Sequence, residues 1–197
     1  NKKGLSIFGP SQKAAMLEGS KVFAKQLMEK YKVPTAKGRV FTESKDAMDY
    51  INSSNMPIVV KADGLAGGKG VAVCRTKDEA VSAVINAIDR HIFGDAGRKI
   101  IIEECLFGEE VSILAFSDGE NIVSLASSMD HKRVYDNDKG PNTGGMGAYS
   151  PVSAVDENLS KEIKNRILYP IIRGMAEEGM PYKGILYAGL MLTDDGP

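Results

Sequence analysis

A glycine-rich stretch, Pro57–Val73, constrains the fold more than any other part of the chain. It reads PIVVKADGLAGGKGVAV: a β-branched run ends at Lys61, and a second apolar run begins at Val71. Four glycines and a second lysine, Lys69, lie between the two runs. This pattern predicts a hairpin whose tip carries bare backbone amides and positive charge, which suits a polyphosphate. A flexible hairpin with solvated lysines fits the same residues, so the stretch alone leaves both interpretations open.

Two well-known phosphate loops are excluded by the spacing of these glycines. A P-loop requires a glycine five residues before the glycine of its Gly-Lys pair, and a Ser or Thr after the lysine. Here Asp63 occupies the first of these positions and Gly70 the second. The dinucleotide-binding fingerprint opens a helix, whereas the residues after Gly70 favour a strand. Among phosphate-binding loops, the remaining interpretation is a hairpin that covers a phosphate.

The composition is that of an ordinary globular protein. The 197 residues are 43% hydrophobic and 26% charged, and the net charge of −1 does not favour nucleic acid or an anionic membrane as a partner. Two cysteines are too few for a disulfide framework, so we expect a reducing, cytoplasmic setting. No apolar run approaches membrane-spanning length, and the first residues do not begin a signal peptide.

Apolar periodicity and capping residues predict an α+β fold. Helices are expected at 11–32, at 42–53 with Thr42 as the N-cap, at 76–92, and at 156–178 with Asp156 as the cap and Gly179 just past the end. The third of these begins with a capping box of Thr76 and Glu79, and its buried stripe is expected to reach Ile92. Strands are expected at 6–10, 38–41, 100–104, 111–116, 122–126 and 184–192, in addition to the hairpin. Lys21 and Lys25 share one face of the first helix, which is typical of a solvated face. Pro170 is expected to kink or divide the last helix, and the aperiodic stretch 127–151 is expected to be an irregular functional loop.

Three groups of residues along this scaffold suggest chemistry. The first is Lys61 with its glycine loop, and the second is the stretch 101–110, a buried strand that leads into acids. Taken alone, the second group favours solvated acids at a strand end. The third joins DHKR at 130–133 to GPNTGGMGAYSP at 140–151. It concentrates hydrogen-bonding groups, exposed amides and cations, so we predict that it binds a small anionic substrate.

These stretches together carry a resemblance to a known family. KADGLAGGKGV, IEECLFGEEVS, DHKR and GPNTGGMGAYSP, in this order and spacing, closely resemble the glycinamide ribonucleotide synthetases, a family of the ATP-grasp superfamily. LEGSK at 17–21 and LYAGLM at 186–191 fit as well, so the resemblance covers essentially the whole chain. The dodecapeptide is the most specific element, whereas the hairpin belongs to ATP-grasp proteins generally. The resemblance implies an ATP-grasp fold, with two α+β subdomains enclosing ATP.

The resemblance also implies how the chain is divided. Residues 1–34 would be a linker helix and the remnant of a preceding domain, 35–105 the small lid subdomain, and 106–197 the central substrate subdomain, incomplete at its end. In the family, a further domain precedes this region, and a strand carrying Mg²⁺ ligands follows it. We therefore expect an internal fragment of a larger multidomain chain, with the metal ligands beyond Pro197 and none within it.

Matching positions imply the ATP contacts. Lys21 and Lys61 match two lysines that hold ATP phosphates, and the loop from Ala66 to Gly70 matches the lid over them. Glu110 matches the acid that accepts hydrogen bonds from the ribose hydroxyls. The ATP-binding residues implied are Lys21, Lys61, Gly67, Gly68, Lys69, Gly70, Glu103, Glu104, Leu106 and Glu110, of which Glu104 and Leu106 would face adenine with their backbone.

The family reaction joins glycine to 5-phosphoribosylamine, converting ATP to ADP and phosphate, in purine biosynthesis. The resemblance implies an acyl-phosphate intermediate, and catalysis by positioning and charge neutralisation with Mg²⁺ and cations. Lys132 and Arg133 are the expected catalytic residues. Substrate contacts are expected from Asp130, Asn142, Thr143, Gly144 and Gly145.

Two alternatives stay open at this point. One is a nucleotide-binding fragment without turnover, because the expected metal ligands would lie outside the chain. The other is an ATP-grasp ligase that acts on a different carboxylate and amine, which the dodecapeptide at 140–151 disfavours.

Overall fold

The computed structural model describes residues 4–136 and 139–197, and for Pro141 and Asn142 it describes the backbone alone. The chain forms two compact units. One, the loop unit, comprises Met16–Gln26 and Thr35–Leu106; the other, the C-terminal unit, comprises Asn1–Ala15, Leu27–Pro34 and Phe107–Pro197. Each unit combines helices with antiparallel strands, so the predicted α+β class is confirmed.

The loop unit is built on a four-stranded antiparallel sheet in the order β1-β4-β2-β3. Its strands are β1 (Gly38–Phe41), β2 (Ile58–Ala62), β3 (Val71–Cys74) and β4 (Ile100–Glu104). Strands β2 and β3 are the arms of the glycine-rich hairpin, and they pair from Ile58 opposite Cys74 to Lys61 opposite Val71. The predicted hairpin is therefore confirmed.

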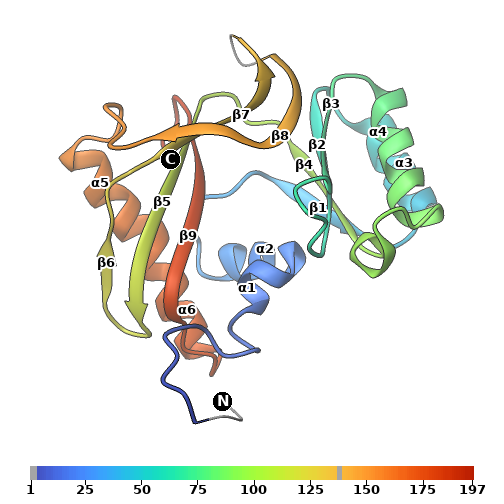
Figure 1. Ribbon diagram of the computed structural model, residues 1–197. Helices are drawn as coiled ribbons and strands as arrows, with labels where there is room; N and C mark the ends of the chain where they lie inside the picture. Colours follow the sequence, from blue (N-terminus) through green and yellow to red (C-terminus); the bar gives the residue numbers. More distant parts are fainter. Residues whose placement is uncertain (1–3, 137–138) are drawn as a thin grey trace. The chain divides into compact units, whose positions relative to one another are not determined.

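Two helices, α3 (Ser44–Ser53) and α4 (Lys77–Val84), cover one face of this sheet (Figure 1). Helix α4 begins with the predicted capping box of Thr76 and Glu79 and runs on into a π-helical turn, η1 (Ile85–Asp89). A short 3₁₀ turn, η2 (Gly94–Gly97), follows. The core between sheet and helices consists of the buried residues Phe41, Ala47, Ile51, Ile58, Val60, Cys74, Ala80, Val84, Ala87, Ile88, Ile100 and Ile102.

Two details of these helices differ from the prediction. The N-cap of α3 is Glu43 rather than Thr42, and no side chain caps it. Ile92 was expected to continue the buried stripe, but its side chain is 57% exposed because η1 ends at Asp89.

The helix predicted at 11–32 is divided in the structure. It comprises α1 (Met16–Gly19) and α2 (Lys21–Lys30), with a break at Ser20. Helix α2 contributes residues to both units. Residues 6–10, predicted as the end of a strand, form none. Within the described ranges, no helix is both long and apolar enough to cross a membrane.

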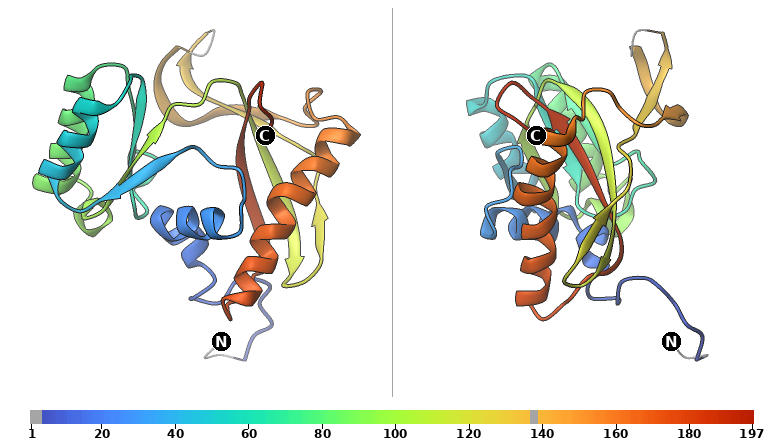
Figure 2. Two further views of the ribbon diagram at one scale, coloured as in Figure 1. Left: turned by 180° about the vertical axis from the view of Figure 1, so that it is seen from behind. Right: turned by 90° about the vertical axis from the view of Figure 1, so that its left-hand side faces the viewer.

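The C-terminal unit contains a three-stranded antiparallel sheet in the order β6-β5-β9. Its strands are β5 (Glu109–Asp118), β6 (Ile122–Ser124) and β9 (Lys183–Leu192), and β5 pairs with β9 along its whole length. A helical stretch lies along one face of this sheet (Figure 2). It consists of α5 (Glu157–Ile163), the π turn η3 (Lys164–Leu168) and α6 (Tyr169–Glu177).

The sequence signals along this helical stretch are confirmed. The Asp156 carboxylate accepts the Leu159 N–H at 2.8 Å and caps α5. Pro170 lies in the first turn of α6, directly after the π turn, so the helical hydrogen-bond pattern changes where a kink or division was predicted, while the backbone stays helical throughout. Gly179 follows the helix with a φ of +72°, a conformation common at helix ends.

The stretch predicted to be irregular forms a hairpin instead. Strand β7 (Met129–Tyr135) pairs with β8 (Lys139–Tyr149), with register shifts between His131 and Tyr135. The sequence of β8, KGPNTGGMGAY, is rich in glycine and contains a proline. It therefore lacks the alternation of apolar and polar residues by which strands are predicted, and the prediction of an irregular loop is wrong for this reason.

Candidate functional site

The tip of the β2–β3 hairpin presents backbone amides at an open surface. Gly67 and Gly68 have φ angles of +57° and +77°, which glycine adopts without strain. A Cβ on either would meet no described atom within 4 Å. At Gly70 a Cβ would lie 2.7 Å from the Cβ of Ala66, so a glycine is needed there to close the loop. The exposed Lys69 adds positive charge to a tip that can accommodate an anion.

Lys21 begins helix α2 and is anchored to the end of β2. Its N–H donates to the Asp63 carbonyl at 3.0 Å, and its ammonium group donates to the Gly64 carbonyl at 3.0 Å. The Asp63 carboxylate accepts the Val22 N–H at 2.8 Å and the Ser20 hydroxyl at 2.7 Å. Asp63 thereby caps α2 together with Ser20, whose own hydroxyl accepts the Phe23 N–H at 3.1 Å. The contacts of Asp63 join residues far apart in the chain, so local sequence patterns do not reveal them.

Lys21 and Lys61, the two predicted phosphate ligands, interact through their charges. Burial lowers the pKa of Lys21, and repulsion by Lys61 lowers it further, whereas Asp63 and Glu18 raise it. Two ammonium groups that repel each other both gain from an anion placed near them. Both predicted lysines therefore lie at the end of β2, Lys61 within the strand and Lys21 on the Asp63 and Gly64 carbonyls just after it, while their contact with phosphate stays a prediction.

Glu103 is buried in the loop unit, and its carboxylate joins two lysines. Lys25 Nζ lies 2.7 Å from one carboxylate oxygen, and Lys61 forms an ion pair with the other. Burial alone would raise the pKa of Glu103, but Lys61 and Lys25 lower it overall. Lys25 is 2% exposed, so the prediction that it lies on a solvated helix face is wrong. Its partner comes from a strand far along the chain, which helix periodicity does not reveal.

The residues predicted to read adenine follow at the end of β4. The Glu104 N–H donates to the Lys37 carbonyl at 2.9 Å, and the Glu104 carboxylate accepts the Lys37 N–H at 2.7 Å. Leu106 is partly exposed just beyond the strand. Contacts from these residues to a base stay a prediction.

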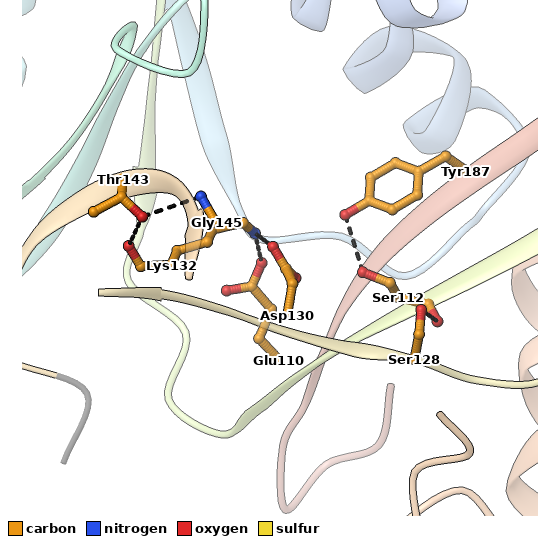
Figure 3. Close-up of polar contacts among 8 residues, drawn as sticks. All are labelled: Glu110, Ser112, Ser128, Asp130, Lys132, Thr143, Gly145 and Tyr187. Carbon is orange, nitrogen blue, oxygen red and sulfur yellow. Dashed lines mark hydrogen bonds and ion pairs between the residues drawn. The ribbon is translucent and has the colours of Figure 1, made fainter. Parts of the chain in front are cut away.

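In the C-terminal unit, Lys132 lies between two carboxylates (Figure 3). It forms an ion pair with Glu110, and its Nζ lies 3.4 Å from a carboxylate oxygen of Asp130. Burial alone would lower the pKa of Lys132, but Glu110 and Asp130 raise it overall. The other carboxylate oxygen of Asp130 is buried and has no hydrogen-bond partner among the described residues. The cluster therefore offers an acceptor that a donor on a ligand could use.

Strand β8 is tied to this cluster by Thr143. The Thr143 hydroxyl donates to the Lys132 carbonyl at 2.8 Å and accepts the Gly145 N–H at 3.0 Å (Figure 3). Gly145 has a φ of +123°, and no described atom lies within 4 Å of a Cβ placed on it or on Gly144. Predicted substrate residues thus border Lys132 at an open backbone segment.

Two further predicted residues, Arg133 and Asn142, lie opposite each other in the β7–β8 hairpin. The Arg133 guanidinium donates to the Gly140 carbonyl at 2.9 Å, a contact within the β7–β8 hairpin. The side chain of Asn142 lies outside the described residues. Their roles stay predictions.

Ser112 and Tyr187 lie near the cluster and carried no sequence signal that would have singled them out. Their hydroxyls are 3.1 Å apart, and the Ser128 hydroxyl donates to the Ser112 carbonyl at 3.4 Å (Figure 3). Tyr187 also contributes to raising the pKa of Lys132. It belongs to the stretch LYAGLM, which supported the resemblance without indicating a role for the tyrosine.

The described residues do not form a metal site. Within residues 4–136 and 139–197, no group of three His, Cys, Asp or Glu side chains is arranged to hold a metal ion. The carboxylates of Glu110 and Asp130 both face Lys132 instead. Mg²⁺ binding requires further oxygen ligands, such as phosphates or additional carboxylates.

Comparison with known proteins agrees with the motifs. The family model described as phosphoribosylglycinamide synthetase, ATP-grasp (A) domain, matches residues 19–197. The phosphoribosylamine–glycine ligase of Listeria monocytogenes is 53% identical over 194 residues, which are 98% of this chain and 46% of that protein. The chain spans about half the length of the curated relatives it matches.

Solved structures show the same fold. The phosphoribosylamine–glycine ligase of Thermotoga maritima matches with a TM-score of 0.85 and 39% identity, over 96% of this chain and 48% of that one. The biotin carboxylase domain of Hydrogenobacter thermophilus 2-oxoglutarate carboxylase, solved with MgADP, matches with a TM-score of 0.72 over 100% of this chain and 41% of that one. At 20% identity the second match supports the fold alone. The chain belongs to the phosphoribosylglycinamide synthetase ATP-grasp (A) domain family.

Proposed function

We propose that this chain is the ATP-grasp part of a ligase that joins glycine to 5-phosphoribosylamine, giving glycinamide ribonucleotide, ADP and phosphate. The observation that carries the proposal is the family match over residues 19–197. We further propose the division into residues 1–34, a lid subdomain at 35–105 and a substrate subdomain at 106–197. A biosynthetic reaction between charged small molecules is consistent with a cytoplasmic location.

The loop unit is proposed to bind the ATP phosphates. Lys61 lies in strand β2, which leads into the glycine loop, and Lys21 begins helix α2, with its ammonium group on the Gly64 carbonyl of that loop. Lysine suits this task, since it acts as a compact charge on a flexible stem. The amides of Gly67 and Gly68, with Lys69 and Gly70, would cover the phosphates, because no described atom fills the space beside the first two.

Adenosine is proposed to contact the end of β4 and the start of β5. The backbone of Glu104 and Leu106 would face the base, and Glu110 would accept the ribose hydroxyls. Glu110 is only half-buried, and its present partner is the Lys132 ammonium, so its carboxylate can exchange one hydrogen-bond donor for another.

The carboxylate cluster is proposed to bind glycine. The free buried oxygen of Asp130 suits the ammonium group of an amino acid, which needs an acceptor of this kind. Lys132 would then face the transferred phosphoryl group and offset its developing negative charge. Open backbone at Gly144 and Gly145, held by Thr143, would let the substrate approach closely.

The proposed reaction has two steps. A carboxylate oxygen of glycine attacks the γ-phosphorus of ATP, and the bond to the bridging oxygen breaks, so that ADP leaves. The amine nitrogen of 5-phosphoribosylamine then attacks the acyl carbon, phosphate leaves with the bonding pair, and the nitrogen loses a proton. Phosphorylation is needed because a bare carboxylate has no adequate leaving group. Mg²⁺ is proposed to accompany ATP, bound largely through its phosphates.

A chimera tests this proposal. The 194-residue span matched in the Listeria monocytogenes ligase is replaced by the corresponding residues of this chain. Phosphate release from ATP is then measured with glycine and 5-phosphoribosylamine, each also omitted in turn. We expect release that depends on both substrates and disappears in a Lys132→Met chimera. A chimera that is folded and binds ATP but shows no such release would contradict the proposal.

The same assay separates the alternatives. If other amino acids support more release than glycine does, the chain belongs to a ligase for another carboxylate. If the 197-residue chain binds ATP by calorimetry while the folded chimera shows no turnover, a nucleotide-binding role without catalysis is favoured.

A further inference from the structure

Lys25 is a buried lysine to which the proposed function assigns no role. Its ammonium group donates to the Glu103 carboxylate at 2.7 Å, to the Thr35 hydroxyl at 2.9 Å and to the Ala36 carbonyl. A lysine ammonium has three N–H donors. All three are engaged inside the loop unit, so Lys25 has none to offer a ligand. Its effect on a ligand must be exerted through another residue.

That other residue is Lys61, reached through Glu103. One carboxylate oxygen of Glu103 faces Lys25 and the other faces Lys61. In the sheet, Val59 lies opposite Glu103 and Lys61 opposite Ile101, so Lys61 and Glu103 are diagonal neighbours on adjacent strands. The register thus places the two side chains within reach of each other.

Space for this arrangement is provided by a glycine on the other neighbouring strand. Gly38 lies opposite Glu103, and a Cβ there would be 2.7 Å from Glu103 Cγ and 2.8 Å from the Ile102 carbonyl oxygen. Real Cβ atoms do not approach other atoms this closely. The base of the Glu103 side chain therefore packs in a space that Gly38 leaves free.

The three side chains differ sharply in exposure. The side chains of Lys25 and Glu103 are 3% and 7% exposed, whereas that of Lys61 is 31% exposed. The group contains two ammonium charges and one carboxylate charge, so its net charge is positive. Since only Lys61 of the three reaches solvent appreciably, the uncompensated charge is presented there.

We propose that Lys25 is a positioning residue for ATP binding. Its buried ammonium group neutralises Glu103, so Lys61 is held in place by Glu103 and still carries a net positive charge toward the phosphates. The inference rests on the proposed function, because it takes Lys61 as a phosphate ligand. Without the charge of Lys25, Glu103 and Lys61 form a neutral pair that attracts a polyphosphate less strongly. A merely structural Lys25 would instead support the fold of the loop unit without favouring phosphate over the rest of the nucleotide.

The test measures dissociation constants for ATP and for adenosine with the full chain. Lys25→Met removes the charge, and Lys25→Gln removes it while keeping an N–H donor for Thr35 and Ala36. We expect each variant to raise the Kd for ATP about tenfold or more and the Kd for adenosine less than about twofold. Lys45→Met removes a charge from an exposed position on α3 and is expected to change neither constant.

A double variant tests whether the net charge of the three side chains controls ATP affinity. Lys25→Met with Glu103→Gln leaves Lys61 without a neutralising carboxylate and restores the net positive charge. We expect this variant to bind ATP more tightly than Lys25→Met alone, although it has lost a further native group. Circular dichroism and thermal unfolding of every variant show that the compared proteins are folded.

Each result decides between the hypotheses. If both Lys25 variants weaken ATP and adenosine equally, or if the double variant binds ATP no better than Lys25→Met, the positioning role is overturned while the proposed function stands. If the wild-type chain binds ATP no more tightly than adenosine, the phosphate site itself fails, and the inference fails with it.

Discussion

Asp63 holds Ser20 at the start of helix α2: the Ser20 hydroxyl donates to the Asp63 carboxylate at 2.7 Å. The same oxygen accepts the Val22 N–H, and the Asp63 carbonyl accepts the N–H of Lys21. The beginning of α2 and the end of strand β2 therefore share one anchor. Because Lys21 lies within that anchor, its position depends on the Asp63 carboxylate as well as on its own helix.

Substitution of this anchor should affect both stability and nucleotide binding. We expect Asp63→Ala to lower the free energy of unfolding by about 1–2 kcal/mol, the usual loss for a helix cap. We also expect weaker ATP binding, since Lys21 loses its support. Urea denaturation and calorimetric titration with ATP measure the two effects.

A matched control exists in the other unit. Asp156 caps α5 through the Leu159 N–H at 2.8 Å. Asp156→Ala should lower stability by a similar amount and leave the Kd for ATP unchanged. Equal weakening of ATP binding by the two substitutions would show that lost stability, rather than the position of Lys21, is responsible.

Removal of the Lys61 ammonium should weaken ATP binding strongly. A hydrogen bond to a charged group contributes about 1.5–3 kcal/mol, so Lys61→Ala is expected to raise the Kd for ATP roughly tenfold to a hundredfold. Stability should fall as well, because Glu103 would retain Lys25 as its partner but lose the second cation. Lys45→Ala on the exposed face of α3 is the control. Unchanged ATP affinity in Lys61→Ala would remove Lys61 from the phosphate site.

Thr143 should matter for turnover more than for nucleotide binding. Its hydroxyl joins the Lys132 carbonyl to the Gly145 N–H, and Thr143→Val removes both hydrogen bonds, each worth about 1 kcal/mol. In the chimeric ligase we expect a several-fold lower rate of glycine-dependent phosphate release with a nearly unchanged Kd for ATP. Thr143→Ser keeps the hydroxyl and should retain the rate. A valine variant as active as wild type would show that this link is dispensable.

Asp118 should make part of the folding stability depend on pH in the acidic range. Hydrogen bonds from the Asn121 side chain and from the N–H groups of Asn121 and Glu120 lower the pKa of Asp118 to about 2. A lowered carboxyl pKa stabilises the folded state fully above the unfolded value of about 3.9, and this contribution is lost as pH falls through about 2. The difference in Tm between wild type and Asp118→Ala should therefore be constant from pH 7 to about pH 5 and shrink toward pH 2. A constant difference across the whole range would contradict this assignment.

Local features of the sequence were sufficient to predict much of the fold. The β2–β3 hairpin, the Thr76–Glu79 capping box and the Asp156 cap all depend on residues within a few positions of one another. Signals of this range are visible along the chain. The β7–β8 hairpin was missed because glycines in β8 remove the side-chain alternation that indicates a strand.

The candidate site was predicted less completely because its contacts are long-range. Asp130 and Lys132 are sequence neighbours, and their group was recognised, whereas the pairing of Lys132 with Glu110 required the structure. The burial of Lys25 could not be predicted either. A lysine four residues from Lys21 is typical of a solvated surface, and its carboxylate partner lies on another element.

The buried charges also help to determine the register of the strands in the loop unit. Strand β4 begins with three successive buried isoleucines, a run that would fill a sheet interior almost equally well if it slipped by a residue. A slip would carry Glu103 away from Lys25 and from the space beside Gly38, leaving a carboxylate in an apolar interior without its cation. The wrong alignment is therefore penalised electrostatically, in a strand whose hydrophobic residues alone do not distinguish it from the right one.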